Sequence, residues 1–306
     1  MAYFEGSVIG HNALIDRLLS IVTGVELDVA MNPLPVNERW TVLADTEEGG
    51  SLNERHVYLR APGSPGGAQP FLQLRRIESV AADWFNIGIS AATGYSSASS
   101  FFNQPNHSGE VFWLLINSAI NYRIKVNGRH LTGDAQVMGS FEPMYMGFGL
   151  PSVFATNYPF PMFIGANHGV FNARWSASDF RHLAFFQPGA GCAKVYHFDG
   201  SWVDVLNRNI SGSPTAGTNV WPWAGTGLML PAPQQLRPGM GGTYRLWPAT
   251  VHGNTGVGQN YMTLEGVYFV TGFSNGPANT LAGNQYFVTQ AATRSDFDMM
   301  AAIQKV

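Results

Sequence analysis

The sequence predicts a mainly β protein of the α+β class, with short antiparallel strands in one or two β-rich lobes and one amphipathic helix near the N-terminus. Short runs of β-branched and aromatic residues recur between clusters of glycine, proline and asparagine, as in strands joined by turns. One segment alone has a convincing helical repeat of apolar positions. The 306 residues are enough chain for a substantial core.

The helix is predicted over residues 7–23. Ser7 is expected to cap its first turn, and Gly24 suits the position after its last residue. The apolar positions of this segment fall on one helical face, as expected for a helix that packs on a core. They are Leu14, Ile15, Leu18, Leu19 and Val22.

Strands are predicted next along the N-terminal part of the chain, separated by turn signals such as the proline- and glycine-rich residues 61–67. Asn127-Gly128 is the strongest hairpin signal, because both residues tolerate the positive φ angles of a tight turn. The predicted strands are residues 40–43, 55–60, 70–75, 83–89, 112–116, 121–126 and 131–139.

A second series of strands is predicted at residues 182–186, 194–198, 202–206, 243–247, 265–271 and 285–291. Asp199-Gly200 predicts another hairpin. We therefore expect two regions: residues 1–180, with the helix and one β-rich lobe, and residues 181–306, with a second β-rich lobe. Residues 207–242 are rich in Gly, Pro, Ser and Thr. This long irregular segment is either a surface excursion or a partner-binding arm.

The composition favours protein contacts over other kinds of binding. Charged residues make up 12% of the chain, which carries 14 Arg but three Lys, and interfaces prefer Arg and aromatic residues to Lys. The alternative is a neutral, glycine-rich β protein that is monomeric. A net charge of −3 without a basic block predicts no nucleic-acid binding.

The compartment is predicted from three absences in the sequence. No apolar stretch approaches the length that spans a bilayer, so no membrane insertion is expected. The first residues lack the pattern of a secretory signal. The single cysteine, Cys192, cannot form an internal disulfide, which fits synthesis in a reducing cytoplasm.

Catalytic, cofactor and metal-binding motifs are weak. Residues 272–276 match G-x-S-x-G around Ser274, but a polar loop follows where a nucleophile elbow needs a helix. His197 and Asp199 lie on one side of a predicted strand, although such a pair is more often a strand-surface histidine than a metal site. We therefore expect no catalytic residue, no cofactor and no metal.

The most distinctive segment is residues 145–165, which combines aromatic residues with three prolines and three glycines and has no charge. Proline excludes a helix here, so the segment is expected to be extended and pinned by turns. Such a segment either lines the protein interior or contacts a partner. Trp221-Pro-Trp223 offers a second aromatic pair, either as a contact for protein or sugar or as the cap of a small local core.

Residues 146–151 and 158–165 in this segment read Met-Gly-Phe-Gly-Leu-Pro and Tyr-Pro-Phe-Pro-Met-Phe-Ile-Gly. Together with residues 120–130, 263–273 and 294–301, they resemble a family of tailed-bacteriophage virion proteins found among tail and neck genes. The chain departs from the family pattern at Arg123, where an aromatic residue is expected, and at Ala166, where a second glycine is expected.

The resemblance implies a structural component of a tailed-phage virion, in the tail, baseplate or neck (collar), made in the cytoplasm of the host bacterium. Its partners would be other virion proteins and further copies of itself in a ring or another symmetric assembly. The predicted contact residues are Tyr158, Phe160, Phe163, Trp221 and Trp223, with a core role as the rival explanation for the first three. The alternative function is a receptor- or glycan-binding virion module.

Overall fold

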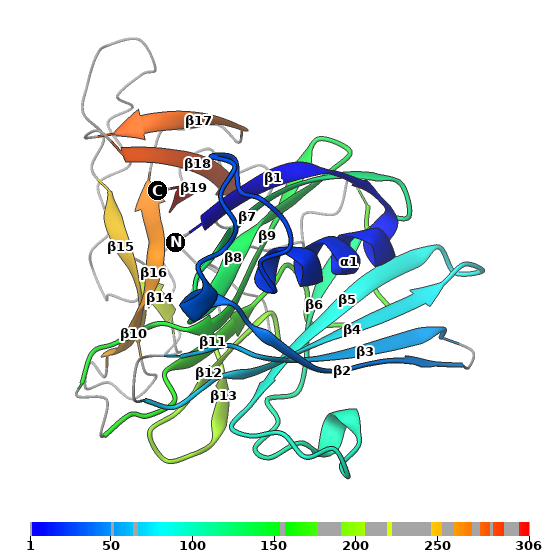
Figure 1. The fold of residues 1–306 in the computed structure, drawn as a ribbon, viewed down its shortest axis with the longest axis horizontal. Coiled ribbons are helices and arrows are strands. Elements are labelled where there is room, and N and C mark those ends of the chain that lie inside the picture. Colours follow the sequence, from blue (N-terminus) through cyan, green and yellow to red (C-terminus); the bar gives the residue numbers. More distant parts are fainter. Residues whose placement is uncertain are drawn as a thin grey trace, which may run out of the picture.

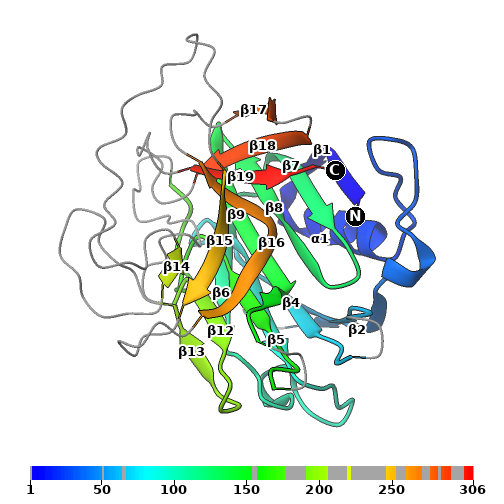
Figure 2. The same ribbon diagram turned by 90° about the vertical axis from the view of Figure 1, so that its left-hand side faces the viewer.

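A computed structural model shows a β-rich protein, which confirms the predicted fold class. It describes residues 2–49, 52–63, 67–153, 157–176, 191–205, 219–221, 246–252, 260–270, 276–281, 284–290 and 300–305. Within these ranges the strands form three antiparallel sheets, two of seven strands and one of five, and α1 (Gly10–Val22) is the one α-helix. Figures 1 and 2 show the three sheets around a shared interior.

The first seven-stranded sheet has the order β1-β7-β8-β9-β11-β12-β13. Its hairpin between β7 and β8 confirms the Asn127-Gly128 prediction, and the Asn127 side chain accepts hydrogen bonds from the backbone N–H groups of Arg129 (2.8 Å) and His130 (3.0 Å). The strands are β1 (Ala2–Ile9), β7 (Ala119–Val126), β8 (His130–Val137), β9 (Ser140–Phe148), β11 (Met162–Gly165), β12 (Ala193–Tyr196) and β13 (Trp202–Asp204).

The five-stranded sheet runs in chain order from β2 to β6. Strand β2 extends to Glu48, beyond the predicted end at residue 43. Its acidic end is accommodated because Asp45 pairs with Arg55 of the adjacent strand, and Glu47 pairs with Arg76 one strand further on. The strands are β2 (Thr41–Glu48), β3 (Glu54–Arg60), β4 (Phe71–Ser79), β5 (Trp84–Ala92) and β6 (Val111–Leu115), and two short 3-10 turns, η1 (Val36–Glu38) and η2 (Phe101–Asn103), lie outside them.

The second seven-stranded sheet has the order β14-β15-β16-β19-β18-β17, with β10 paired to β16 off this path. It covers one face of the first sheet, where the rings of Phe287 and Tyr3 lie 5.6 Å apart. The strands are β10 (Leu150–Pro151), β14 (Asn219–Trp221), β15 (Trp247–His252), β16 (Asn260–Val270), β17 (Gly276–Leu281), β18 (Asn284–Gln290) and β19 (Met300–Gln304).

Helix α1 begins three residues later than predicted, and the predicted cap is wrong. Ser7 lies in β1, where it pairs with Asn121 of β7, so inter-strand hydrogen bonds replace the expected helical turn. The predicted end is confirmed: Gly24 follows the helix at φ 74° and donates its N–H to Ile21 O at 3.0 Å. The helix lies between β1 and β7 on one side and β4 and β5 on the other (Figure 1). Of the five predicted face residues, four are fully buried and Leu19 is half-buried.

The predicted boundary at residue 180 does not separate two sheets. Strand β12, beyond that position, pairs with β11 before it, and β10 pairs with the distant β16. The Asp199-Gly200 hairpin is confirmed between β12 and β13, with Gly200 at φ 88°. The predicted strand at residues 182–186, Ser274, and residues 207–242 apart from β14 lie outside the described residues.

Candidate interaction surface

The connection between α1 and β2 contains a hairpin-like excursion, which we call the apolar hairpin (residues 25–37). Its turn closes on itself, because Asp28 Oδ1 accepts the N–H groups of Ala30 (2.9 Å) and Asn32 (2.8 Å). The N–H of Asp28 also donates to Asn32 O at 2.8 Å, and Leu27 forms a bridge with Pro33. These local bonds give the excursion a defined shape, and Figure 2 shows it standing out from the body of the ribbon near the N-terminus.

Both ends of the apolar hairpin are fixed to the core. Leu34 is fully buried, and Trp40, just beyond the hairpin, donates its indole N–H to Asn127 O at 2.8 Å. At the other side, the N–H of Val29 donates to Tyr3 O of β1 at 3.0 Å. The position of the hairpin on the body is therefore set by contacts far apart in the sequence.

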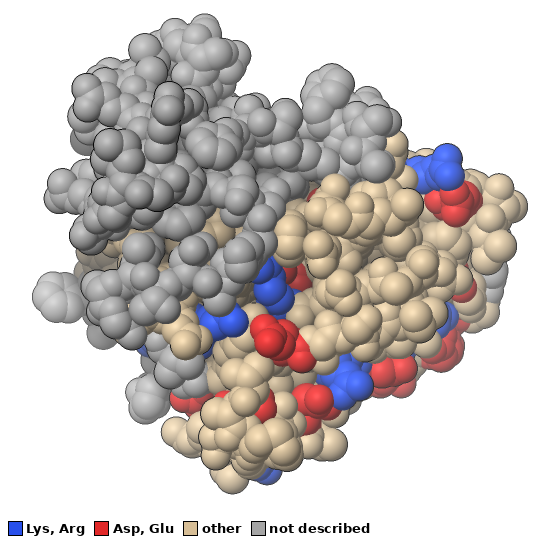
Figure 3. Space-filling view, turned by 90° about the horizontal axis from the view of Figure 1, so that it is seen from above, with Lys and Arg blue, Asp and Glu red and all other residues tan. Residues whose placement is uncertain are grey.

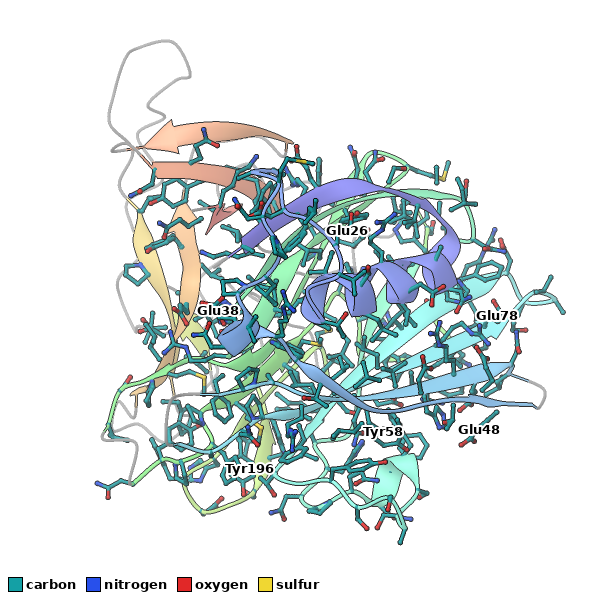
Figure 4. The ribbon with its side chains drawn as sticks, viewed as in Figure 1. Glu26, Glu38, Glu48, Tyr58, Glu78 and Tyr196 are labelled. Carbon is teal, nitrogen blue, oxygen red and sulfur yellow. The ribbon has the colours of Figure 1, made fainter. Side chains whose placement is uncertain are left out.

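The charged side chains of this segment are engaged in local contacts. Glu26 forms an ion pair with Arg17 of α1, and the carboxylate of Asp28 is used by the turn. Just after the hairpin, Arg39 Nε donates to Leu34 O at 2.9 Å. Figure 4 shows Glu26 beside α1 and Glu38 at the 3-10 turn η1. Glu26, Asp28 and Arg39 thus pair with a neighbouring charge or with the backbone.

Apart from the buried Leu34, the large aliphatic side chains of the same segment are exposed. Val36 is 77% exposed, Val25 75%, Met31 73%, Val29 52% and Leu27 44%. Across residues 25–37, all of which the structure describes, the exposed polar side chains are two uncharged asparagines, Asn32 and Asn37. This group of exposed aliphatic side chains on an ordered scaffold makes the apolar hairpin the candidate interaction surface.

Charged side chains are sparse on one face of the molecule. Figure 3 shows, from above, small groups of Lys or Arg atoms next to Asp or Glu atoms, separated by broad areas of other residues.

A second notable group of residues lies where the first sheet meets the C-terminal sheet, and we call it the buried junction (Lys125, Arg129, His130, Tyr145, Glu265 and Gly266). It brings together sequence segments that are far apart, residues 125–130 and 265–266. Glu265 Oε2 accepts a hydrogen bond from Arg129 Nη2 at 2.5 Å and lies 3.5 Å from His130 Nδ1. The His130 and Tyr145 rings stack at 5.1 Å and an angle of 6°.

Lys125 is fully buried, and its Nζ has no hydrogen-bond partner among the described residues. Burial lowers the pKa of Lys125 from 10.5 to about 8, against the opposing effect of Glu265. A Cβ atom at position 266 would overlap the Lys125 Nζ, and Gly266 has a φ of 71°, so glycine allows β16 to pass close to the amine. Burial, Lys125 and Arg129 hold the pKa of His130 well below its usual value.

The buried junction has reactive residue types but no access for a substrate. Lys125, His130 and Tyr145 are fully buried. An amine or imidazole used in catalysis must reach the reacting atoms. The geometry of the buried junction therefore fits a structural contact that holds the two sheets together.

A further polar cluster lies under the loop 93–109, on the face of the five-stranded sheet away from α1. Arg75 pairs with both Glu110 and Glu54, so one guanidinium occupies the space between the two carboxylates. His107 Nε2 lies 3.1 Å from Ser90 Oγ, and burial lowers the pKa of His107 to about 4. This cluster attaches the loop to the sheet. The described residues contain no group of three or more His, Cys, Asp or Glu side chains placed to bind a metal ion.

The contact residues predicted from the aromatic tract have a different setting. Tyr158 and Phe163 lie in the core, at 1% and 0% exposure, and Phe160 is half-buried against it. This burial agrees with the rival explanation that they hold the protein's own interior together. The backbone of Trp221 belongs to β14, while its side chain and all of Trp223 lie outside the described residues.

The sequence analysis missed the apolar hairpin. The available signal was the alternation of Val25, Leu27, Val29 and Met31 with Glu26 and Asp28. By itself that alternation predicts a strand with its apolar side buried, which is the reverse of the orientation found.

Comparison with protein-family models finds no family that matches the chain. Comparison with curated protein sequences likewise finds no match. Within the described residues, no helix is long and apolar enough to cross a bilayer.

Proposed function

We propose that this chain is a structural component of a tailed-phage virion, in the tail, baseplate or neck (collar). It would be made in the host bacterial cytoplasm and act by symmetric self-association and by docking to other virion proteins. The resemblance of its motifs supports the virion assignment. The observation that carries the docking role is the apolar hairpin, because an ordered segment whose charges are already paired and whose aliphatic side chains are mostly exposed suits a partner that covers it.

The structural setting of the family-like motifs supports a mechanical role. Leu150 and Pro151 pair with Thr263 and Met262 in the C-terminal sheet, and residues 162–165 pair with β9 and β12 in the first sheet. The aromatic, proline-rich tract thus joins sheets to one another. Lys125, Arg129 and Glu265, which belong to two further family-like segments, meet at the buried junction. Motifs that build a rigid body suit a part that transmits or resists force.

Quantitative peptide mass spectrometry on purified particles of the encoding phage tests this function. We expect a small, fixed copy number, similar to that of other ring components. Cross-linking of the same particles then identifies the neighbours. Absence of the chain from complete, infectious particles would refute the virion role.

The receptor-binding alternative predicts a different phenotype. Particles carrying Trp221→Ala and Trp223→Ala would assemble normally and fail to adsorb to cells. A structural component that assembles with these changes retains adsorption. The adsorption assay therefore separates the two roles without depending on copy number.

A further inference from the structure

We propose that the outer edge of β1 pairs with the same edge of a second copy of this chain, in an antiparallel contact across a two-fold axis at Ser7. The contact joins the first sheets of the two copies into one continuous sheet. It rests on the proposed function and specifies the surface through which the chain associates with itself.

Two backbone hydrogen bonds show which residues of β1 face its outer edge. Just beyond the end of the strand, the N–H of Gly10 donates to Ser118 O, beside β7, at 2.8 Å. Near the start, Tyr3 O accepts the N–H of Val29 at 3.0 Å, on the side away from β7. Residues that bond to the neighbouring strand alternate with residues that do not. The even-numbered residues therefore bond to β7, and the odd-numbered residues direct their N–H and C=O groups outward.

The outward backbone groups of Glu5, Ser7 and Ile9 are open. Among the described residues, no hydrogen bond reaches the N–H or C=O of these three positions on the outer side. Glu5, Gly6, Ser7 and Ile9 are also exposed, and Figure 1 shows β1 at one end of the first sheet with α1 below it. A row of unpaired backbone donors and acceptors is a template for a further strand.

The other sheet edges in the described part of the chain carry features that discourage such pairing. Strand β2 has an irregular register and an acidic end, and β6 is bridged by His168. Strands β13 and β14 have three residues each, and the register of β17 is irregular. Short, irregular, charged or covered edges resist the addition of a strand. In contrast, β1 keeps a regular register over all eight of its residues.

A second copy fits the limits of the open edge. The edge begins after Tyr3, which is bonded to Val29, and it ends at Ile9, where the chain enters α1. An antiparallel copy centred on Ser7 places Ser7 opposite Ser7 and Glu5 opposite Ile9, so each pair can exchange two hydrogen bonds. Beyond Ile9 the partner has left the strand as a helix, so the bond between Val29 and Tyr3 is kept. The same patch serves both copies, which makes the contact isologous.

The charge of β1 favours the same register. Glu5 is the one charged residue of the strand, and its carboxylate lies 3.7 Å from Lys305 Nζ. Centring the contact on Ser7 places each Glu5 opposite an Ile9 that is 71% exposed. Like charges directly opposite each other destabilise a strand pair, and this register avoids them.

The test uses the full-length purified chain and two substitutions at the axis. Ser7→Pro removes an outward N–H, and an edge strand tolerates proline where its N–H faces solvent. Ser7→Lys places two ammonium groups opposite each other. Ser97→Lys, at an exposed serine of the loop 93–109, is the control for the added charge. Circular dichroism and urea unfolding confirm that each variant folds.

Sedimentation velocity and native mass spectrometry measure association. We expect the wild type and Ser97→Lys to form a concentration-dependent dimer, and both Ser7 variants to associate at least about tenfold more weakly. Hydrogen exchange provides a direct readout, because the amides of Glu5, Ser7 and Ile9 should exchange more slowly in the concentrated wild type than in the dilute one.

Substitutions at Ile9 test the register. Ile9→Lys places a cation opposite Glu5 of the other copy and should strengthen the dimer, whereas Ile9→Glu places two carboxylates opposite each other and should weaken it. We expect the dissociation constants of these two variants to differ by at least about tenfold.

Three results would overturn the contact: a wild-type chain that stays monomeric at about 100 μM, wild-type association in both Ser7 variants, or equal dissociation constants for the two Ile9 variants. These measurements do not depend on whether the chain is found in virions. A dimer in a chain that is absent from virions would refute the proposed function alone, and a monomer in a chain that is present there would refute this contact alone.

Discussion

The buried junction and the apolar hairpin reverse the usual distribution of polar and apolar groups in opposite ways. The junction places Lys125 and His130 at 0% exposure, where charge is costly. The hairpin exposes Val25, Met31 and Val36, where aliphatic side chains gain nothing from folding. Both occur in a chain with few charged residues, so neither is an effect of composition.

The two regions differ in how far apart in the sequence their contacts lie. In the junction, polar groups from segments more than a hundred residues apart meet only when the two sheets are correctly joined, which favours one arrangement of the sheets. In the hairpin, a locally closed turn leaves aliphatic side chains exposed. The first region stabilises the chain itself, and the second is where we propose contact between chains.

Breaking a buried ion pair beside the junction should have the largest effect. Asp134, with a fully buried side chain, pairs with Arg123, whose guanidinium lies between the rings of Phe141 and Phe287 at 4.3 and 4.6 Å. Asp134→Ala leaves Arg123 without this partner and should lower the free energy of unfolding by about 3–5 kcal/mol. Urea unfolding at pH 7 measures it.

The exposed pair of Arg174 and Asp83 provides the control, at 66% and 59% side-chain exposure. Arg174→Ala should change stability by less than about 1 kcal/mol. Equal effects of the two substitutions would contradict the distinction between buried and exposed pairs.

Replacing the buried amine should stabilise the protein. The pKa of Lys125 in the folded chain is about 8, below its ordinary 10.5, so the unfolded chain binds more protons between these values and wild-type stability rises with pH across that window. At pH 7, Lys125→Met should add roughly 3 kcal/mol to the free energy of unfolding. The gain should vanish as pH approaches the ordinary pKa.

Urea unfolding of both proteins from pH 7 to 10.5 checks this prediction. Lys194→Met is the control, because the Lys194 amine pairs with Asp204 at 2.6 Å near the surface. A gain for Lys125→Met that is the same at every pH would show that packing, and not charge burial, causes it.

Filling the space beside the amine should have a smaller, opposite effect. Gly266→Ala adds a Cβ that overlaps Lys125 Nζ at a positive φ and should destabilise the protein by about 1–3 kcal/mol. Thermal unfolding measures it. In a Lys125→Ala background, the added Cβ no longer overlaps the amine. If Gly266→Ala destabilises that variant as much as the wild type, the loss of stability comes from the backbone conformation alone.

The smallest effect on stability is expected in the hairpin. Val36 is 77% exposed, so Val36→Ser should change the free energy of unfolding by less than about 0.5 kcal/mol. Leu34, two residues away, is fully buried, and Leu34→Ala should cost about 2–5 kcal/mol. Similar losses for both would mean that the hairpin packs on its own chain.

Local features of the fold could be predicted because short-range sterics and hydrogen bonds determine them. Gly24 ends α1 because glycine adopts a positive φ without strain. Asn127-Gly128 forms a hairpin because the asparagine side chain accepts the N–H groups of the turn. The burial of Tyr158 and Phe163 also agrees with one of the two explanations that their sequence context allowed.

What the sequence determined by itself is therefore the class of fold, the helical segment and its end, and the turns that join neighbouring strands. Tertiary structure decided the rest. Ser7 entered a strand because β7 supplied backbone partners, and Lys125 became buried because β16 covers it. The alternation at residues 25–31 defined two faces but not which of them meets solvent. Long-range pairing makes that choice, because it decides which face of each segment the remaining chain covers.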